Sequence, residues 1–399
     1  MITVRILYLS QRYFPHEKGG AAISLRILAE NMARKHEVAV FTVDTKNTTE
    51  IVNHVLVIRR QVPKLSKMLY ETAKRQKRKL KSILVRLSMI LDLYHEEFIK
   101  ILENELDNFK PQIVHLNNVV GFPLKKIYRI LKRRRIKIIQ SVHDSFLLGI
   151  LGISSSGFPI PFWYQYTNNV LSKCDIVHFP SKTIMEKFGK KISTRKVVIP
   201  NTVGRDFEEE LWEELVSKKK KELPKKMIFA GTLSKYKGVH LLASCYKDLY
   251  KDLGENLQLI FVGDGPARNF LETDLENFIK SGKVKITGWI PFEEVEKFFK
   301  EAHFVVLPSQ VQETFGRVLV EGFYNGCLPI GSSWGAIPEV IGDNSLIFDN
   351  YEQLLAIIRY YYNEGVWFKK MYELKENMKK FSLSNHIMRF EKLYRELLK

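Results

Sequence analysis

Short apolar runs recur along both halves of the chain, and each is followed by a loop and then by a segment with helical spacing. Repeated units of strand and helix are typical of parallel, doubly wound sheets. The pattern is interrupted by a polar, charged stretch at residues 204–226, which we interpret as a linker, and then restarts. The expected strands are residues 4–9, 38–42, 55–59, 113–116, 136–143 and 175–180 before this stretch, and 227–230, 257–262, 284–287, 304–307, 328–330 and 345–348 after it.

These units predict an α/β protein with one doubly wound sheet in each of two domains, residues 1–203 and residues 204–380. With 399 residues, 45% of them hydrophobic, the chain is long enough to bury two cores. Residues 381–399 form an amphipathic pattern with no following strand, and we expect this helix to pack back onto the first domain. Ligands bind beyond the carboxyl ends of such strands, so two facing sheets predict a central cleft.

The three cysteines, Cys174, Cys245 and Cys327, have neither disulfide nor zinc spacing, as is typical of reduced cytoplasm. Residues 146–163 come nearest to a membrane span, but glycine, serine and proline interrupt them and predict a loop-rich segment. The first residues lack the basic lead and cleavage site of a signal peptide, and we expect them to form a strand. The sequence therefore predicts a soluble, cytoplasmic protein.

The excess positive charge lies in the first half of the chain. Residues 1–200 hold 35 Lys and Arg against 15 Asp and Glu, whereas residues 201–399 hold 28 against 29. The charge is concentrated in residues 64–86, from Lys64 to Arg86, and in residues 125–137, from Lys125 to Lys137. Such an asymmetry favours an anionic partner for the first half.

The first basic run mixes nine Lys and Arg with leucine, isoleucine and methionine and contains a single acidic residue. This mixture is typical of a helix that lies on an anionic membrane surface. Nucleic acid could satisfy the same charge, but Tyr70 and Tyr128 are the only aromatic residues of the two runs, and no nucleic-acid module is recognisable. We favour the inner face of the cytoplasmic membrane as the partner and expect no nucleic acid.

Two glutamates, Glu313 and Glu321, stand eight residues apart in a strand–loop–helix unit that begins with residues 304–307. A loop carries Glu313, a helix is predicted to begin near Gly316, and Glu321 falls between one and two turns into it. A carboxylate can accept two hydrogen bonds from neighbouring sugar hydroxyls, and the free N–H groups at a helix start suit a phosphate. Together these groups predict a site for a nucleotide sugar.

Other candidate residues also follow strands. Lys235 and Lys237 lie in a loop after residues 227–230 and could pair with a diphosphate, although surface lysines are the ordinary alternative. Gly20 follows the first strand, where glycine allows backbone N–H groups to approach an anion. His115 and His143 each end a strand, and we weight His143 above His115, because a lone histidine is more often structural.

Several kinds of chemistry have no motif in the sequence. Asp-x-Asp does not occur, and no His, Cys or Asp cluster has metal-ligand spacing. We therefore expect no metal and no cofactor beyond the nucleotide-sugar co-substrate. A P-loop and a Gly-x-Ser-x-Gly elbow are also missing, which argues against P-loop NTPases and α/β-hydrolases.

The chain resembles the retaining glycosyltransferases of family 4, also called glycosyl transferases group 1. The residues that carry the resemblance occur in the family's order from end to end, and the glutamate pair is the most specific of them. The resemblance implies a GT-B fold, in which two Rossmann-like domains face each other. The matching segments are Gly19-Gly20, residues 113–115, 142–144, 199–201, 231–238, 263–266 and 288–299, and the block from Glu313 to Glu321.

By this resemblance, Glu321 would hold the donor's ribose and Glu313 would hold hydroxyls of the transferred hexose. Lys237 would bind phosphate, and His143 would contact the sugar near the reacting carbon. The remaining donor contacts would come from Gly20 at the diphosphate, from Ile290 at the base, and from the backbone amides of Thr314, Phe315 and Gly316 at the sugar and distal phosphate.

One position departs from the family pattern. Thr232 follows Gly231 where the family usually has arginine, which weakens the expected diphosphate contact, and Lys235 is the residue that could compensate. The resemblance further implies front-face attack with retention of configuration, in which the departing diphosphate oxygen takes the acceptor's proton.

The expected function is transfer of a hexose from a nucleotide sugar, a UDP-sugar first, to a saccharide or lipid-linked acceptor in surface polysaccharide or glycolipid synthesis. Two alternatives remain open at this point. A sugar-nucleotide epimerase uses the same architecture, and a non-enzymatic protein that binds a membrane or nucleic acid would explain the basic half but not the glutamates.

Overall fold

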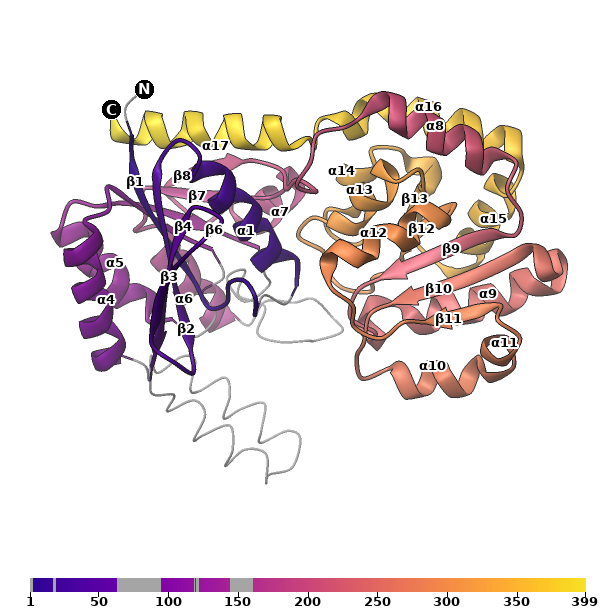
Figure 1. Ribbon diagram of the computed structural model, residues 1–399, viewed down its shortest axis with the longest axis horizontal. Helices are drawn as coiled ribbons and strands as arrows, with labels where there is room; N and C mark the ends of the chain where they lie inside the picture. Colours follow the sequence, from indigo (N-terminus) through magenta and orange to yellow (C-terminus); the bar gives the residue numbers. More distant parts are fainter. Residues whose placement is uncertain (1–2, 17–18, 63–94, 118, 120–121, 144–160) are drawn as a thin grey trace.

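The computed structural model describes residues 3–16, 19–62, 95–117, 119, 122–143 and 161–399 (Figure 1). The first basic run, residues 64–86, lies outside these ranges, as do all but the last three residues of the predicted loop-rich segment. Within them, no helix has both the length and the apolar content needed to cross a bilayer.

The first domain is built on an eight-stranded sheet with the order β3-β4-β2-β1-β5-β6-β7-β8. All neighbours are parallel except β3, which pairs antiparallel with β4. The strands are β1 (Arg5–Ser10), β2 (Glu37–Asp44), β3 (Thr48–Val52), β4 (Val55–Gln61), β5 (Ile113–Leu116), β6 (Lys137–Ser141), β7 (Ile176–Phe179) and β8 (Arg195–Val198). The sequence pattern missed β3 and β8, because both are edge strands with few buried residues.

Helices cover both faces of this sheet. Alternate residues of β1 point to opposite faces, so Leu7 and Leu9 pack with α4, α5, α6 and α7, while Ile6 and Tyr8 pack with α1 and α17. The helices are α1 (Gly20–Met32), α4 (His95–Phe109), α5 (Leu124–Arg133), α6 (Pro161–Leu171), α7 (Lys182–Phe188) and α17 (Leu383–Leu398).

The second domain has a six-stranded parallel sheet with the order β11-β10-β9-β12-β13-β14. Its strands are β9 (Lys225–Ala230), β10 (Leu257–Val262), β11 (Val284–Ile286), β12 (Phe304–Leu307), β13 (Leu328–Ser332) and β14 (Ile347–Phe348). Its helices are α8 (Glu209–Lys220), η1 (Lys235–Lys237), α9 (Val239–Leu253), η2 (Gly254–Asn256), α10 (Arg268–Asp274), α11 (Glu276–Lys280), α12 (Phe292–Glu301), α13 (Arg317–Tyr324), α14 (Ile337–Ile341), η3 (Asn344–Leu346), α15 (Tyr351–Tyr361) and α16 (Glu364–Lys379). Two doubly wound domains are the fold that the sequence predicts.

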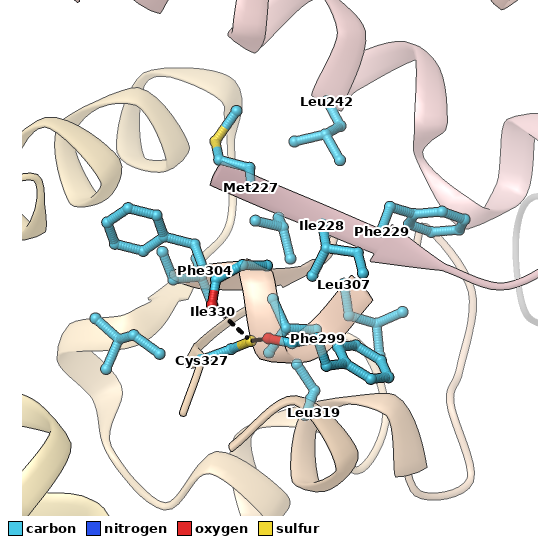
Figure 2. Packing of buried hydrophobic residues seen from close by; sticks show 14 of the residues in the cluster. Met227, Ile228, Phe229, Leu242, Phe299, Phe304, Leu307, Leu319, Cys327 and Ile330 are labelled. Carbon is cyan, nitrogen blue, oxygen red and sulfur yellow. Dashed lines mark hydrogen bonds between the residues drawn. The ribbon is translucent and has the colours of Figure 1, made fainter. Parts of the chain in front are cut away.

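Apolar side chains from β9, β12 and β13 form the centre of the second core (Figure 2). Met227 and Phe304 are fully buried there, and Cys327 lies beside them as a buried thiol. The Cys327 Sγ donates to the carbonyl oxygens of Phe299 and Ala302, each at 3.1 Å, which ties the end of α12 to the start of β13. Burial raises the pKa of this thiol to about 11, so it serves packing rather than reactivity.

The interpretation of residues 204–226 as a polar linker is wrong over α8. Trp212, Val216 and Lys219 are buried on one face of this helix, at the i, i+4, i+7 spacing that packs a helix onto a domain. The Trp212 indole N–H donates to the Phe323 carbonyl at 2.8 Å. Lys219 Nζ donates to the carbonyls of Phe299, Ala302 and Asn325 at 2.6–2.9 Å, which satisfies its buried ammonium. The surrounding charge hides this face in the sequence.

The chain returns to the first domain through its last helix. Figure 1 shows α17 lying along the first domain, with its end beside the start of β1. Phe390, Leu393 and Tyr394 are buried against that domain. The Tyr394 hydroxyl lies 3.0 Å from the Tyr8 hydroxyl and 2.7 Å from His115 Nδ1.

A chain of buried histidines extends this contact. His115 Nε2 and His178 Nδ1 both lie 2.7 Å from the Ser141 hydroxyl, and His386 Nδ1 donates to the Pro200 carbonyl at 2.6 Å. Burial lowers the pKa of His115 to about 3 and that of His386 to about 4, and it lowers the pKa of His178 well below its usual value. These histidines are therefore neutral at pH 7, and His115 is a structural residue.

This histidine network predicts a loss of stability in mild acid. Because the folded pKa values lie below the unfolded value of 6.5, the unfolded chain binds protons that the folded chain does not as the pH falls below 6.5. Each such histidine lowers the free energy of unfolding by up to about 1.4 kcal/mol for each pH unit below 6.5. We expect the free energy of unfolding in urea to fall between about pH 6.5 and 5, and the slope to be shallower in His386→Gln.

His54→Asn is the matched control, because His54 is exposed. This variant should keep the wild-type slope. A free energy of unfolding that does not change over this pH range in the wild-type protein would contradict the neutral state of the network.

Candidate active site

The centre of the site is an ion pair between two loops of the second domain. Lys237 Nζ lies 2.5 Å from Glu313 Oε1, with the lysine at the end of η1 and the glutamate in the loop after β12. The Ser309 hydroxyl also donates to Glu313 Oε1. Both charged side chains are largely buried, with 26% of Lys237 and 15% of Glu313 exposed. The pairing of neighbouring strands β9 and β12 brings these two loops together.

Two glycines allow the loops to approach. Gly238 has φ +73°, and a Cβ at this position would lie 1.8 Å from the Pro308 carbonyl oxygen. Gly335 has φ +68°, and a Cβ there would lie 2.3 Å from the Glu313 carbonyl oxygen. Ala336, which follows Gly335, holds the backbone of Glu313, because the Ala336 N–H donates to the Glu313 carbonyl at 2.9 Å. The carboxylate is therefore fixed by its backbone as well as by its ion pair.

Backbone N–H groups lie beside this pair. Helix α13 begins after Gly316, which has φ +95°. In the described part of the chain, no hydrogen bond uses the N–H groups of Thr314, Phe315 or Gly316. The Phe315 ring is buried and packs edge-on against Phe381, with 5.3 Å between ring centroids. Three successive donors at a helix start, next to a lysine, can bind an anion.

Glu321 lies one turn into α13 and is also paired. Arg317 Nε donates to Glu321 Oε1 at 2.7 Å, and the side chains are only 8% and 14% exposed. Sequence reasoning missed Arg317 and also Ser309. The i, i+4 spacing of Arg317 and Glu321 on a helix could have identified the arginine. The pair leaves Glu321 Oε2 free of recorded partners in the described part of the chain, so one carboxylate oxygen can accept from a ligand.

His143 meets this loop from the first domain. It lies two residues beyond β6, and its carbonyl oxygen accepts from the Thr314 hydroxyl at 2.9 Å. Burial, and to a smaller extent His386, lower the pKa of its imidazole to about 4. His143 is therefore a neutral group at pH 7 that can donate or accept one hydrogen bond at each ring nitrogen.

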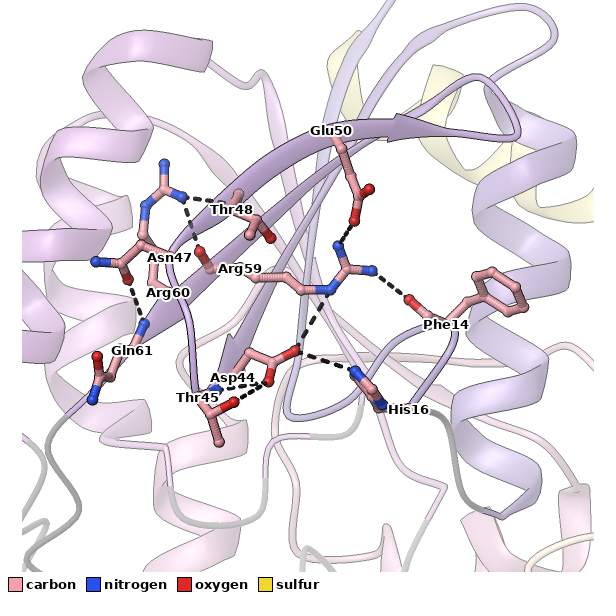
Figure 3. Close-up of polar contacts among 10 residues, drawn as sticks. All are labelled: Phe14, His16, Asp44, Thr45, Asn47, Thr48, Glu50, Arg59, Arg60 and Gln61. Atoms are coloured by element: carbon pink, nitrogen blue, oxygen red, sulfur yellow. Dashed lines mark hydrogen bonds and ion pairs between the residues drawn. The ribbon is translucent and has the colours of Figure 1, made fainter.

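Gly20 is the first residue of α1, and its backbone is exposed. A Cβ at Gly19 or Gly20 would meet no atom within 4 Å, so a ligand has room to approach. Figure 3 shows how the preceding loop is held. The buried Arg59 donates to the Phe14 carbonyl at 2.5 Å and pairs with Asp44 and Glu50.

The remaining predicted residues lie around the same sheet edge. Ile290 is partly buried after β11, where Gly288 forms a bridge with Gly263. Thr232 is exposed beyond β9. Lys235 does not reach Glu313; it lines a cavity of about 460 Å³ together with Tyr236, Trp334 and Asp349. Lys237 is therefore the lysine that the structure places at the glutamate.

Two family models match successive parts of the chain. The glycosyltransferase family 4 model matches residues 18–207, and the glycosyl transferases group 1 model matches residues 211–381. The chain belongs to the family 4, group 1 glycosyltransferases. An uncharacterized glycosyltransferase of Methanocaldococcus jannaschii is 26% identical over 100% of this chain and 99% of its own length.

Two further relatives also match most of the chain. An uncharacterized 42.6 kDa protein in the cps region of Klebsiella pneumoniae is 25% identical over 84% of this chain and 87% of its own. The alpha-monoglucosyldiacylglycerol synthase of Streptococcus pneumoniae is 22% identical over 93% and 82%.

Solved structures confirm the GT-B fold. The sucrose-phosphate synthase of Thermosynechococcus elongatus superposes with a TM-score of 0.75 at 17% identity, over 99% of both chains. Anabaena HepE in complex with UDP-glucose superposes with a TM-score of 0.67 at 15% identity, over 98% of this chain and 100% of its own.

We expect the two glutamates to differ in their effects on binding and turnover. We expect Glu321→Ala to weaken binding of the nucleotide sugar, because the resemblance assigns its carboxylate to the donor's ribose. We expect Glu313→Ala chiefly to lower kcat, by about ten- to a hundredfold, because it removes the group that orients Lys237. Steady-state kinetics and calorimetric titration of the donor separate the two effects. Wild-type kinetics in both variants would refute the assignment.

Proposed function

We propose that this glycosyltransferase transfers a hexose from a UDP-sugar to a saccharide or lipid-linked acceptor, with retention of configuration. The observation that supports the proposal most is the Lys237–Glu313 pair beside three backbone N–H groups that make no hydrogen bond among the described residues. Lys237 and the N–H groups would bind the diphosphate, Glu313 the hexose hydroxyls, and Glu321 the ribose. The UDP-glucose complex of the Anabaena neighbour supports the choice of nucleotide.

Catalysis in this proposal is mainly positioning and charge stabilisation. The bond between the anomeric carbon and the diphosphate oxygen breaks while the acceptor oxygen attacks from the same face. The departing oxygen takes the acceptor's proton. Lys237 and the amides of residues 314–316 would stabilise the negative charge that develops on the diphosphate. His143, neutral at pH 7, would hydrogen-bond the sugar rather than add a charge.

We further propose that the reaction needs no divalent metal. Among the described residues, no three His, Cys, Asp or Glu side chains are grouped as a metal site. A lysine and a helix start are the groups available to the diphosphate. Activity that persists in EDTA would support this, and activity restored only by added Mg²⁺ or Mn²⁺ would oppose it.

The donor can be identified by ligand-induced stabilisation. We expect UDP-sugars to raise the thermal unfolding temperature more than GDP- or ADP-sugars, with slow release of UDP by hydrolysis when no acceptor is present. A ligand concentration of about a hundred times Kd raises the free energy of unfolding by about 2.7 kcal/mol. No response to any nucleotide sugar would contradict the proposal, and conversion to an epimeric nucleotide sugar without acceptor would favour the epimerase.

An anionic membrane surface is the proposed location of the acceptor. On α5 and just after it, Lys125, Arg129, Lys132 and Arg135 are exposed and have no recorded ion pair in the described part of the chain. The neighbouring Arg134 pairs with Asp107 of α4 and is partly neutralised. The synthase of Streptococcus pneumoniae, whose name denotes a glycolipid product, supports a lipid-linked acceptor.

Vesicle flotation tests this surface. We expect binding to vesicles that contain anionic lipid, weakening as salt rises, and a loss of about 1 kcal/mol for each charge removed in the triple variant Lys125→Gln, Arg129→Gln, Lys132→Gln. The control is Lys218→Gln, Lys251→Gln, Lys280→Gln, whose lysines are 71–75% exposed in the second domain. Equal binding by both triple variants would rule out α5 as part of the surface.

A further inference from the structure

Glu339 of the second domain caps a helix of the first. Its Oε1 accepts from the Lys182 N–H at 2.8 Å, and its Oε2 accepts from the Thr183 N–H and from the Thr183 hydroxyl, both at 2.7 Å. Lys182 and Thr183 are the first two residues of α7, whereas Glu339 lies in α14. One carboxylate therefore makes three hydrogen bonds across the domain boundary.

The loop that carries Glu313 and Thr314 also contacts the start of α7. The Ser181 hydroxyl, which accepts from the Ile184 N–H and so caps α7, donates to the Thr314 carbonyl at 2.9 Å. The Thr314 hydroxyl in turn donates to the His143 carbonyl at 2.9 Å. Thr314 directly follows Glu313. The contacts of Ser181 and Thr183 thus hold the second domain on both sides of the Glu313 loop.

The segment that leads into α14 and carries Glu339 also contacts the backbone of Glu313. Glu339 lies three residues after Ala336, whose N–H donates to the Glu313 carbonyl. Gly335 packs against the same backbone so closely that any side chain would clash. A movement of α14 away from α7 would therefore displace the backbone that carries Glu313.

Both Glu339 and Glu293 contact the first domain through their carboxylates, but Glu339 makes three hydrogen bonds to it and is partly buried. Hydrogen bonds from a helix start to a carboxylate are charge-assisted, and the helix dipole adds to them. The other carboxylate contact joins Arg26 of α1 to Glu293 of α12 at 2.8 Å, but 63% of the Glu293 side chain is exposed. Exposed pairs of this kind contribute little.

We propose that Glu339 is a positioning residue that sets the arrangement of the two domains in which Thr314 and His143 face the same donor. This inference rests on the proposed function of the Glu313 loop. Glu339 does not contact the donor, so it acts on the rate of transfer through the geometry of the loop. Apart from Gly20, the residues assigned to UDP lie in the second domain, so we expect binding of UDP to depend on Glu339 much less than transfer does.

The test is Glu339→Gln in the full chain, a change that keeps the size of the side chain and removes its charge. We expect kcat for transfer to fall about tenfold, the Kd for UDP to stay within about twofold, and the radius of gyration in solution to increase. Hydrogen exchange at the Lys182 and Thr183 amides should become faster. Glu293→Gln is the matched control, and we expect wild-type values from it.

Thr183→Val tests the same contact from the first domain, because it removes the hydroxyl that donates to Glu339. We expect it to lower kcat in the same direction, and we expect the double variant to lower kcat by less than the product of the two single effects. Unchanged kcat and radius of gyration in Glu339→Gln would overturn the proposal. So would a Kd for UDP that rises as much as kcat falls, because that result indicates local unfolding of the loop.

The solution measurements separate this proposal from the proposed function. If the wild-type protein transfers no sugar from any nucleotide sugar, the function is wrong. The radius of gyration and amide exchange still decide whether Glu339 holds the domains together.

Discussion

The ion pair between Lys237 and Glu313 depends on the order of strands in the second sheet. Strands β9 and β12 are neighbours although four α-helices and two strands separate them in sequence, and their loops leave the sheet at the same edge. Parallel pairing therefore brings together a cation and a carboxylate that lie 76 residues apart. Gly238 and Gly335 let the loops close to contact distance. The helix start at Gly316 then presents its N–H groups beside the pair.

The first domain contacts the loop of Glu313 through Ser181 and His143. His143 accepts from Thr314 by its backbone, so the position of its ring is tied to the loop of the second domain. The last helix, α17, crosses back and buries Phe390 and Tyr394 against the first sheet. The chain thus joins its domains twice, once before α8 and once between α16 and α17. This double connection and the Glu339 contact together restrict how the two sheets can face each other.

The sequence predicted those features that follow from local pattern and from the rule for parallel sheets. Apolar runs identified the central strands, and the position of Glu313 and Lys237 after two of them was enough to expect a ligand there. Edge strands β3 and β8 were missed because little of their surface is buried. Helix α8 was missed because its apolar face consists of two residues and a buried lysine among many exposed charges.

Contacts between distant segments could not be predicted from local pattern. The contact between Ser309 and Glu313 depends on the conformation of their loop, whereas the helical spacing of Arg317 and Glu321 was the only local signal for their pair. His115 is structural because its ring is buried and hydrogen-bonded to Tyr394, which lies 279 residues away in the sequence. The three hydrogen bonds from Glu339 to α7 follow only from the placement of the domains.

The most direct test of the donor site is a crystal structure of the full chain with UDP and with an unreactive UDP-sugar. We predict the ribose hydroxyls within hydrogen-bond distance of the Glu321 carboxylate, the diphosphate on Lys237 and the amides of residues 314–316, and the sugar between Glu313 and His143. A nucleotide bound elsewhere, or bound here with its ribose away from Glu321 and its diphosphate away from Lys237, would contradict the assignment.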